Sequence, residues 1–384
     1  MKSKDDIVKC RLKEVRKQNG LTQIQLAELV GIKRQAVYDM EIGRYLPNTG
    51  VALKLAKTLG CTVEDIFYES ASDNEQYLPA TVVDIGKRLG SGNQIKHQTT
   101  RVTLSKIKDR FIAYPLENCI SADHGGMQAA DAILSPCGKR VKLLYDEEFL
   151  EKNVLLMGCD PAFSLLRSHV SRTSAKSEVC WRFTSTYRAL ERLLEGNTHL
   201  AGIHLHNIDS KESNVESARK IMGNEKGKIV GFSLFEEGLM VAHGNPFKIK
   251  GVDDLADKNI KIVNREPEAA LRVLLDDCLK RSNISSSEIS GYNDTVGGHF
   301  EGANLVMLGR ADAALGLRAV ALSFGLDFVP ITSVRCDLVI PEHIIDLPSV
   351  QVILDVMQTK KFRDELSFLP GYETSSTGKV IATL

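Results

Sequence analysis

The stretch LTQIQLAELVGIKRQAVYDMEIGRYLPNTGVALKLAKTLGCTVEDIF, residues 21–67, decides the first part of the fold. Thr22 stands directly before an apolar pattern with helical spacing, where a hydroxyl can cap the first helix. Gly31 allows a tight turn, and a second helix is expected from about Lys33 to Ile42. A short helix, a glycine-containing turn and another helix are typical of a helix-turn-helix motif.

The second helix of this motif is amphipathic. Val37 and Met40 would pack against the first helix, while the other side carries hydrogen-bonding groups. The outward-facing residues are Lys33, Arg34, Gln35, Tyr38 and Asp39. Such a face suits contact with phosphates and base edges, although a solvated helix surface has the same composition.

The whole stretch resembles the Xre/Cro phage-repressor-type DNA-binding domain, in its LTQ, LA, RQ, E-G-R-x-x-P and ALKLAKTLG elements. The resemblance implies five helices, with the third in the major groove of a double-stranded DNA operator. It places these residues at phosphates or base edges: Gln23, Lys33, Arg34, Gln35, Tyr38 and Arg44. Asp39 would repel phosphate, so it is expected either to accept from a cytosine amino group or to pair with a basic neighbour. Because such domains read paired half-sites, a homodimer is expected.

Charge divides along the chain. The 384 residues hold 49 basic and 49 acidic side chains, and a zero balance by itself disfavours a polyanionic partner. Residues 1–68, however, contain 12 Lys/Arg and 8 Asp/Glu, a balance of +4, and the remainder balances at −4. The modest +4 suggests that one copy binds DNA weakly and that two readers act together.

Composition excludes several classes of protein. With 43% hydrophobic and 26% charged residues, the chain is neither collagen-like, nor low-complexity, nor a membrane bundle. Its eight cysteines are scattered and form no CxxC pair, so neither a zinc site nor any other metal or cofactor is expected. The N-terminus shows no apolar signal core, and no apolar run is long enough to span a membrane. We therefore expect a cytoplasmic protein with reduced thiols.

The rest of the chain divides into three parts. Residues 69–100 show little periodicity and are interpreted as a linker, and residues 101–150 read as a small β-rich module. Over residues 151–384, strands and helices alternate as in an α/β domain. Ile229–Phe232 and Leu239–Ala242 are expected as two separate strands there.

This last part resembles the periplasmic-binding-protein-like domain related to molybdate-binding proteins. Its signature segments are LLMGCDPAFSLL (155–166), FEEGLMVAHGNP (235–246), VNREPEAALRVLLD (263–276) and FRDELSFLPGYETSSTG (362–378). The resemblance implies two lobes of type II topology hinged around a cleft. The expected fold is therefore an all-α helix-turn-helix domain, a small β-rich module and a two-lobed α/β domain.

Three strand-to-helix turns, at residues 158–161, 184–186 and 264–268, carry polar groups that could hold a ligand at helix starts, where backbone N–H groups are free. In the first turn, Asp160 is expected to cap the helix and Pro161 to occupy its first position. The candidate ligand-binding residues are Asp160, Thr184, Ser185, Thr186, Arg265, Arg272 and His299. Taken singly, each turn is better explained as an ordinary helix cap, whereas the three together in a binding-protein-like fold favour a ligand cleft. The expected effector is a molybdate- or tungstate-like oxyanion or a small acidic molecule.

The third turn departs from its family pattern. The family commonly has NRxPGSGTR, whereas here Glu268-Ala269-Ala270-Leu271 replaces the Gly-Ser-Gly-Thr turn, which weakens the molybdate inference. Both arginines could bind an acidic ligand or could pair with Glu266, Glu268 or Asp276. His204 and His206 lie two apart in an expected strand, and structural roles are favoured for both.

The favoured hypothesis is a ligand-responsive transcription regulator. One alternative is a cytoplasmic small-molecule-binding protein whose helical domain contacts other proteins. Another is an enzyme of molybdenum-cofactor metabolism, with Cys159, Ser185 or His299 as reactive groups. Catalysis is not expected, because the chain contains no GxSxG elbow, HExxH, Walker A or Rossmann fingerprint.

Overall fold

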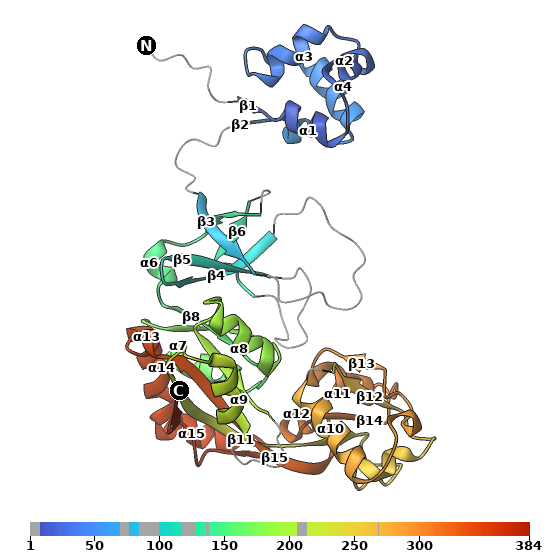
Figure 1. Cartoon of the computed structure of the whole chain (residues 1–384), viewed down its shortest axis with the longest axis vertical. Helices are drawn as coiled ribbons and strands as arrows, with labels where there is room; N and C mark the ends of the chain where they lie inside the picture. The colour runs from blue at the N-terminus through green and yellow to red at the C-terminus, as the bar shows by residue number, and fades with distance from the viewer. Residues whose placement is uncertain are drawn as a thin grey trace. The chain divides into compact units, whose positions relative to one another are not determined.

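The computed structural model forms two compact units, residues 1–76 and residues 77–384 (Figure 1). We describe each unit by itself. The structure describes residues 8–69, 77–83, 100–116, 128–135, 138–205, 213–267 and 269–384.

The first unit is helical. Its helices are α1 (Leu12–Gln18), α2 (Gln23–Val30), α3 (Arg34–Glu41), α4 (Thr49–Leu59) and α5 (Val63–Ile66). Strands β1 (Val8–Cys10) and β2 (Phe67–Glu69) pair antiparallel where the chain enters and leaves these helices. The core is a single cluster that α1 to α5 all contribute to.

Local signals set the helix boundaries of this unit. Thr22 and Gln25 form a reciprocal capping box at the start of α2, which confirms the expected cap. Gly31 ends α2 in the left-handed conformation, with φ 76°, so a residue without Cβ fits there. The second helix of the motif is found at Arg34–Glu41, within one residue of its expected bounds at each end.

The second unit begins with a closed five-stranded barrel in the order β3-β5-β4-β6-β7. Its strands are β3 (Tyr77–Val82), β4 (Thr100–Ile107), β5 (Arg110–Pro115), β6 (Ala132–Leu134) and β7 (Arg140–Leu143), followed by α6 (Glu147–Leu150). β3 lies inside the 69–100 segment that we expected to be a linker. It pairs with β5 and β7, so this strand is part of the barrel. Its Pro79, a residue uncommon inside strands, weakens the strand signal in the sequence.

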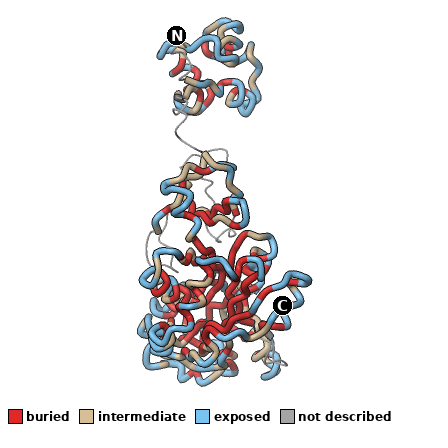
Figure 2. The backbone as a smooth tube through the Cα atoms, turned by 90° about the vertical axis from the view of Figure 1, so that its left-hand side faces the viewer, coloured by how far each residue is buried: buried red, intermediate tan, exposed pale blue. Residues whose placement is uncertain are grey.

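The α/β part is built on one ten-stranded sheet, with main order β13-β12-β14-β11-β15-β10-β8-β9 and with β16 and β17 paired to β11. The strands are β8 (Asn153–Met157), β9 (Glu178–Arg182), β10 (Leu200–Ile203), β11 (Gly227–Val241), β12 (Ile262–Arg265), β13 (Thr295–Val296), β14 (Ala313–Leu317), β15 (Asp327–Pro341), β16 (Tyr372–Glu373) and β17 (Val380–Thr383). Figure 2 shows buried residues concentrated in the interior of this part of the chain.

Helices cover this sheet in two lobes. The first lobe carries α7 (Phe163–Thr173), α8 (Thr186–Leu194), α9 (Ser213–Met222), α13 (Glu342–Ile345), α14 (Pro348–Gln358) and α15 (Lys360–Ser367). The second lobe carries α10 (Ala270–Arg281), α11 (His299–Met307), α12 (Arg318–Ser323) and the short 3-10 turns η1 (Val252–Ala256) and η2 (Ser286–Glu288). This arrangement agrees with the expected two-lobed α/β fold.

Strands β11 and β15 belong to both lobes. Each is 15 residues long, and they pair antiparallel with two register shifts, at Gly231/Ser233 and Glu237/Gly238. β10 of the first lobe pairs with residues 337–339 of β15, and β14 of the second lobe pairs with residues 237–241 of β11. The two strands expected at 229–232 and 239–242 are therefore halves of one strand. The polar residues Ser233 and Glu237 between them are buried, and they interrupt the apolar pattern but not the strand.

The barrel packs against the first lobe. Ile107, Ile112 and Tyr114 belong to the same buried cluster as residues of β8, α8 and β10. The Tyr114 hydroxyl donates to the carbonyl of Asn197 at 2.8 Å. Asn153 donates from its side chain to the carbonyl of Leu104 at 2.9 Å. Apolar burial and buried hydrogen bonds thus join the barrel to this lobe.

Candidate functional site

The expected DNA-reading residues lie at and around α3. Lys33 is the N-cap of α3, while Arg34, Gln35 and Tyr38 lie on the helix and Arg44 follows it. All five side chains are exposed, so the face that we expected to read DNA is open to solvent. Their contact with phosphates or base edges stays a prediction.

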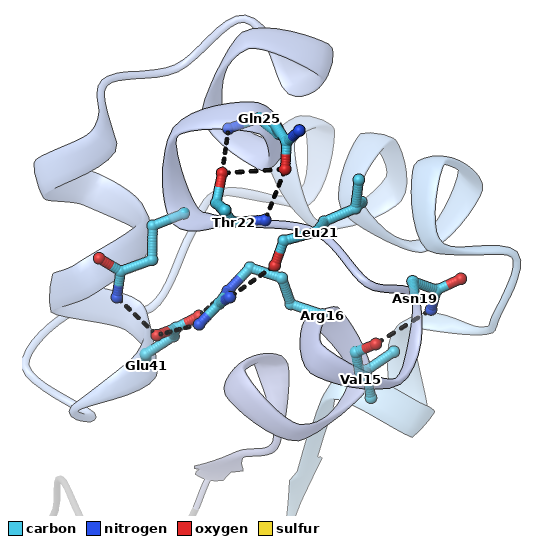
Figure 3. A network of polar contacts seen from close by, with 8 residues as sticks. Val15, Arg16, Asn19, Leu21, Thr22, Gln25 and Glu41 are labelled. Atoms are coloured by element: carbon cyan, nitrogen blue, oxygen red, sulfur yellow. Dashed lines mark hydrogen bonds and ion pairs between the residues drawn. The ribbon is translucent and has the colours of Figure 1, made fainter.

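The sixth residue, Gln23, is half-buried and has a partner. Its amide donates to Glu41 Oε2 at 2.8 Å. Arg16 donates to the same carboxylate from Nε at 2.6 Å and from a terminal nitrogen at 3.2 Å, and also to the carbonyl of Leu21 at 2.7 Å (Figure 3). This network joins α1, α2 and the end of α3, so it fixes the orientation of the reading helix. Sequence reasoning missed it, because Arg16 and Glu41 are 25 residues apart.

Asp39 has a neighbour on its own helix. The Gln35 amide donates to Asp39 Oδ1 at 3.1 Å, one helical turn away. Its partner is therefore an amide and not the basic residue that we had expected. The other expectation, that Asp39 accepts from a cytosine amino group, stays a prediction.

Asp160 is buried between the first lobe and the C-terminal segment. Its carboxylate accepts from the backbone N–H of Ala162 at 2.8 Å, from Ser233 Oγ at 3.0 Å and from the Tyr372 hydroxyl at 2.7 Å. Burial raises the pKa of Asp160, and these hydrogen bonds oppose that rise. Three protein donors already hold this carboxylate, so Asp160 links α7 to β11 and β16.

The start of α7 differs from the expectation that Asp160 caps it and Pro161 occupies its first position. The helix begins at Phe163, and its N-cap is Ala162. A Cβ on Gly202 would come within 2.4 Å of the Phe163 ring, and one on Gly158 within 2.8 Å. These glycines let the ring lie directly on the strand ends, and the chain makes a turn there before the helix starts.

The second expected turn lies at the start of α8. Thr186 is buried, and its hydroxyl donates to the carbonyl of His204 at 2.9 Å and accepts from the His204 N–H at 3.1 Å. Thr184 is also buried, and its N–H donates to the carbonyl of Gly158 at 3.3 Å. Ser185 is the N-cap, half-exposed, and makes no capping hydrogen bond through its side chain. The Ser185 side chain therefore leaves the start of α8 uncapped.

Cys159, His204 and Glu237 form a buried chain that sequence reasoning missed. The Cys159 Sγ lies 3.2 Å from His204 Nδ1, and His204 Nε2 lies 3.3 Å from Glu237 Oε1. Burial lowers the pKa of His204, but the thiol and the carboxylate outweigh it, so the net pKa is raised well above its usual value. The expected structural role of His204 fits this position, which joins the ends of β8 and β10 to β11. His206 lies outside the described residues.

Both candidate arginines of the second lobe are paired with acids. Arg265 is buried and makes two 2.9 Å contacts with Glu266, and it also donates to the carbonyl of Gly297 at 3.4 Å. Arg272 Nε contacts Asp276 at 3.1 Å. This is the pairing we had considered as the alternative to ligand binding. The remaining acid of that alternative, Glu268, lies outside the described residues.

His299 is the first residue of α11, and it faces the first lobe. Its ring meets Phe183 edge-on, with centroids 6.1 Å apart. Among the described residues, its buried Nδ1 has no hydrogen-bond partner. Burial and the nearby Arg265 lower the pKa of His299 to about 3, so the imidazole is neutral at physiological pH.

The expected ligand residues therefore separate into two sets. His299, Arg265 and the segment leading into Ser185 come together where the lobes meet, through the contacts of Phe183 with both His299 and Arg265. We call this the interlobe centre. Asp160 and Arg272 are directed to partners within the protein. In the described part of the chain, no helix is long and apolar enough to cross a membrane, and no group of three His, Cys, Asp or Glu could hold a metal ion.

Comparison with known proteins matches both units to families. Residues 12–66 match a helix-turn-helix model, and residues 167–358 match a model of the PBP (periplasmic-binding-protein) superfamily domain. An uncharacterised protein of Bacillus subtilis, YvgK, is 29% identical over 229 residues, which are 60% of this chain and 73% of YvgK. An HTH-type transcriptional regulator of Methanothermobacter thermautotrophicus is 47% identical over 57 residues, 15% of this chain and 83% of that protein. The solved structure of Peb3 from Campylobacter jejuni is 18% identical, with a TM-score of 0.41, over 58% of this chain and 99% of Peb3.

Proposed function

Because this chain belongs to the helix-turn-helix family of transcription regulators and carries a domain of the PBP superfamily, we propose that a small polar ligand at the interlobe centre controls its DNA binding. The ligand is a small acid or an oxyanion. The regulator acts in the cytoplasm as a homodimer that reads two half-sites of a double-stranded operator.

One observation carries the ligand site. A buried polar atom without a hydrogen bond is costly, and His299 Nδ1 is such an atom among the described residues. It lies at the start of α11, and its ring contacts Phe183, which precedes the open start of α8. With the proton of the neutral ring on Nδ1, an anionic ligand would accept from this nitrogen and from N–H groups at the start of α8, and would satisfy groups of both lobes at once.

The shape of the domain supplies a mechanism for control. The lobes share β11 and β15, so a change in the angle between them moves the whole first lobe and the barrel packed on it. A ligand shifts DNA binding only if it prefers one lobe arrangement, and its differential affinity sets the size of the effect. The exposed basic groups at α3, two copies per dimer, supply the attraction to phosphate.

The test measures binding of the intact protein to DNA from its own upstream region. Fluorescence anisotropy detects the binding at several salt concentrations. Molybdate, tungstate, sulfate and simple organic acids are added in turn. We expect salt-sensitive, sequence-preferring binding that one of these ligands changes. Arg34→Ala should reduce the salt slope by about 1 and weaken binding, whereas the exposed Lys54→Ala on α4 should have a smaller effect.

Two variants separate the parts of the proposal. His299→Gln should keep DNA affinity and lose the response to the ligand, because the glutamine amide does not provide a hydrogen-bonding group at the position of the imidazole Nδ1. If Arg34→Ala leaves DNA binding unchanged, the helical unit does not read DNA and a role in protein contacts is favoured. If none of the ligands changes DNA binding, or if His299→Gln responds normally, the interlobe centre is not the sensor.

A further inference from the structure

A cavity of about 180 Å³ lies between the barrel and the first lobe, and its lining includes none of the residues His299, Arg265, Phe183 and Ser185. Strands β4 and β9, the segment before β6 and the chain around α6 line it. The lining residues that matter for its chemistry are Thr103, Asp131, Tyr145, Phe149, Lys152 and Arg182.

Arg182 is the unusual group of this cavity. It is 8% exposed, and its guanidinium donates to the hydroxyl of Thr103 at 2.6 Å. Within the described part of the chain, no carboxylate lies at ion-pair distance from it. Guanidinium stays charged in proteins, and a buried charge without a partner is expensive. Arg16 shows the usual solution, since a bidentate contact with Glu41 and a carbonyl surround it.

The other charges around the cavity leave a positive excess. Glu178 is held by Arg167 at 3.0 Å, so its charge is already compensated. Asp131 attracts Arg182 at longer range, but it accepts a hydrogen bond from the backbone of Leu104 at 2.8 Å. Lys152 adds a further positive charge, 3.6 Å from the centre of the Phe149 ring. An anionic group is what this arrangement lacks.

The walls set the size and shape of the ligand. Tyr145 and Phe149 stack with ring centroids 4.7 Å apart, and Lys152 covers the other face of Phe149. Both rings are more than 40% exposed, so the outer face of Tyr145 and the edge of Phe149 remain available. An apolar cavity of about 150 Å³ is large enough to bind benzene. A volume of about 180 Å³ therefore suits a compact molecule with one acidic group.

We propose that this cavity is a second ligand site, which binds a small organic carboxylate with its acid on Arg182 and its body against Tyr145 and Phe149. Such a ligand bridges β4 of the barrel and β9 of the first lobe. It would thus act on the barrel directly, as an input separate from the interlobe centre.

Intrinsic fluorescence tests the proposal with benzoate as the probe. Trp181, the only tryptophan of the chain, belongs to the lining, so its emission reports on the cavity. The intact protein should give a saturable change, with affinity about ten-fold or more weaker in Arg182→Gln and partly restored in Arg182→Lys. Arg172→Gln, an exposed change on α7, should bind as the parent does. Inorganic phosphate, which lacks the apolar body, should bind more weakly than benzoate.

A second measurement needs no ligand. If Arg182 is kept for binding, Arg182→Met should raise the midpoint of thermal unfolding of the ligand-free protein, because it removes an unpaired buried charge. A lower midpoint would show a structural role for the guanidinium and overturn the proposal. Absence of a saturable signal with benzoate, or equal affinity in Arg182→Gln and the parent, would overturn it as well.

Discussion

The buried polar network of the helical unit and the interlobe centre of the α/β unit differ in how their buried polar groups obtain hydrogen bonds. In the first, Arg16, Glu41 and Gln23 meet one another with short, charge-assisted hydrogen bonds. In the second, His299 is equally buried, yet its Nδ1 lacks a partner among the described residues. The first arrangement fixes how α3 is presented, and the second leaves a hydrogen-bonding position open.

The difference teaches which buried polar groups to associate with binding. A buried group with all its hydrogen bonds made contributes to one defined conformation. A buried group with an open hydrogen-bonding position reduces stability, and a bound ligand, ion or water is one explanation for it. Three changes break or sharpen this comparison, and we take them from the largest expected effect to the smallest.

Glu41→Gln should be the most damaging. It leaves the buried Arg16 guanidinium without its carboxylate, a loss of about 3–5 kcal/mol in buried pairs. Hydrogen exchange of the α1–α3 amides in the intact protein, under increasing urea, measures the free energy of opening of this unit. The matched control is Glu28→Gln, on the exposed side of α2, which should change it by less than about 0.5 kcal/mol. Equal effects of the two substitutions would mean that the Arg16–Glu41 network does not hold α3 in place.

His299→Gln should change how the α/β unit responds to acid. The folded pKa of about 3 lies below the usual 6.5, so the unfolded chain binds a proton that the folded protein does not. The contribution of the neutral His299 ring to the free energy of unfolding is therefore fully present above pH 6.5, and it is lost as the pH falls toward 3. At one pKa unit per 1.36 kcal/mol, the loss is about 2 kcal/mol at pH 5.

Urea unfolding between pH 7 and pH 4 measures this effect. The variant should show a shallower acid slope than the parent protein. The variant should keep the acid dependence that is due to His199. Burial lowers the pKa of His199 to about 4, although both of its ring nitrogens are within hydrogen-bond distance of partners. Identical slopes in variant and parent would place His299 in a solvated environment and contradict the described burial.

Asp39→Asn should have the smallest effect on stability. Its contact with Gln35 is exposed and lies within one helical turn, so the free energy of unfolding should change by less than about 0.5 kcal/mol. Binding to non-specific DNA should strengthen, because a negative charge leaves the reading face. Anisotropy at low salt measures this, and weaker binding to every sequence would contradict it.

The sequence predicted features that depend on neighbours along the chain. The capping box at Thr22, the left-handed Gly31 and the bounds of α3 all follow from residues within four positions of one another. The exposed face of α3 follows from helical periodicity. The two lobes came from family resemblance rather than from periodicity.

Features that depend on distant partners were not predictable in the same way. Glu41 lies 25 residues from Arg16, and His204 lies 45 residues from Cys159, so neither contact leaves a local pattern. The polar residues Ser233 and Glu237 hid the continuity of β11, because they break the apolar pattern although both are buried beside polar partners, Asp160 and His204. Two of the donors to Asp160, Ser233 and Tyr372, are also distant along the chain, so no local pattern predicts these contacts.

The two 15-residue strands that cross from lobe to lobe have a mechanical consequence. Two hydrogen-bonded strands that connect two lobes form an elastic hinge. They resist bending in proportion to the angle and return to the original angle when the load is removed. This hinge bends most easily at the register shifts near Gly231 and Gly238, because the hydrogen-bond ladder is already interrupted there. Restoring regular pairing at either point would stiffen the joint, and the response to a ligand would weaken without any change at the residues that hold it.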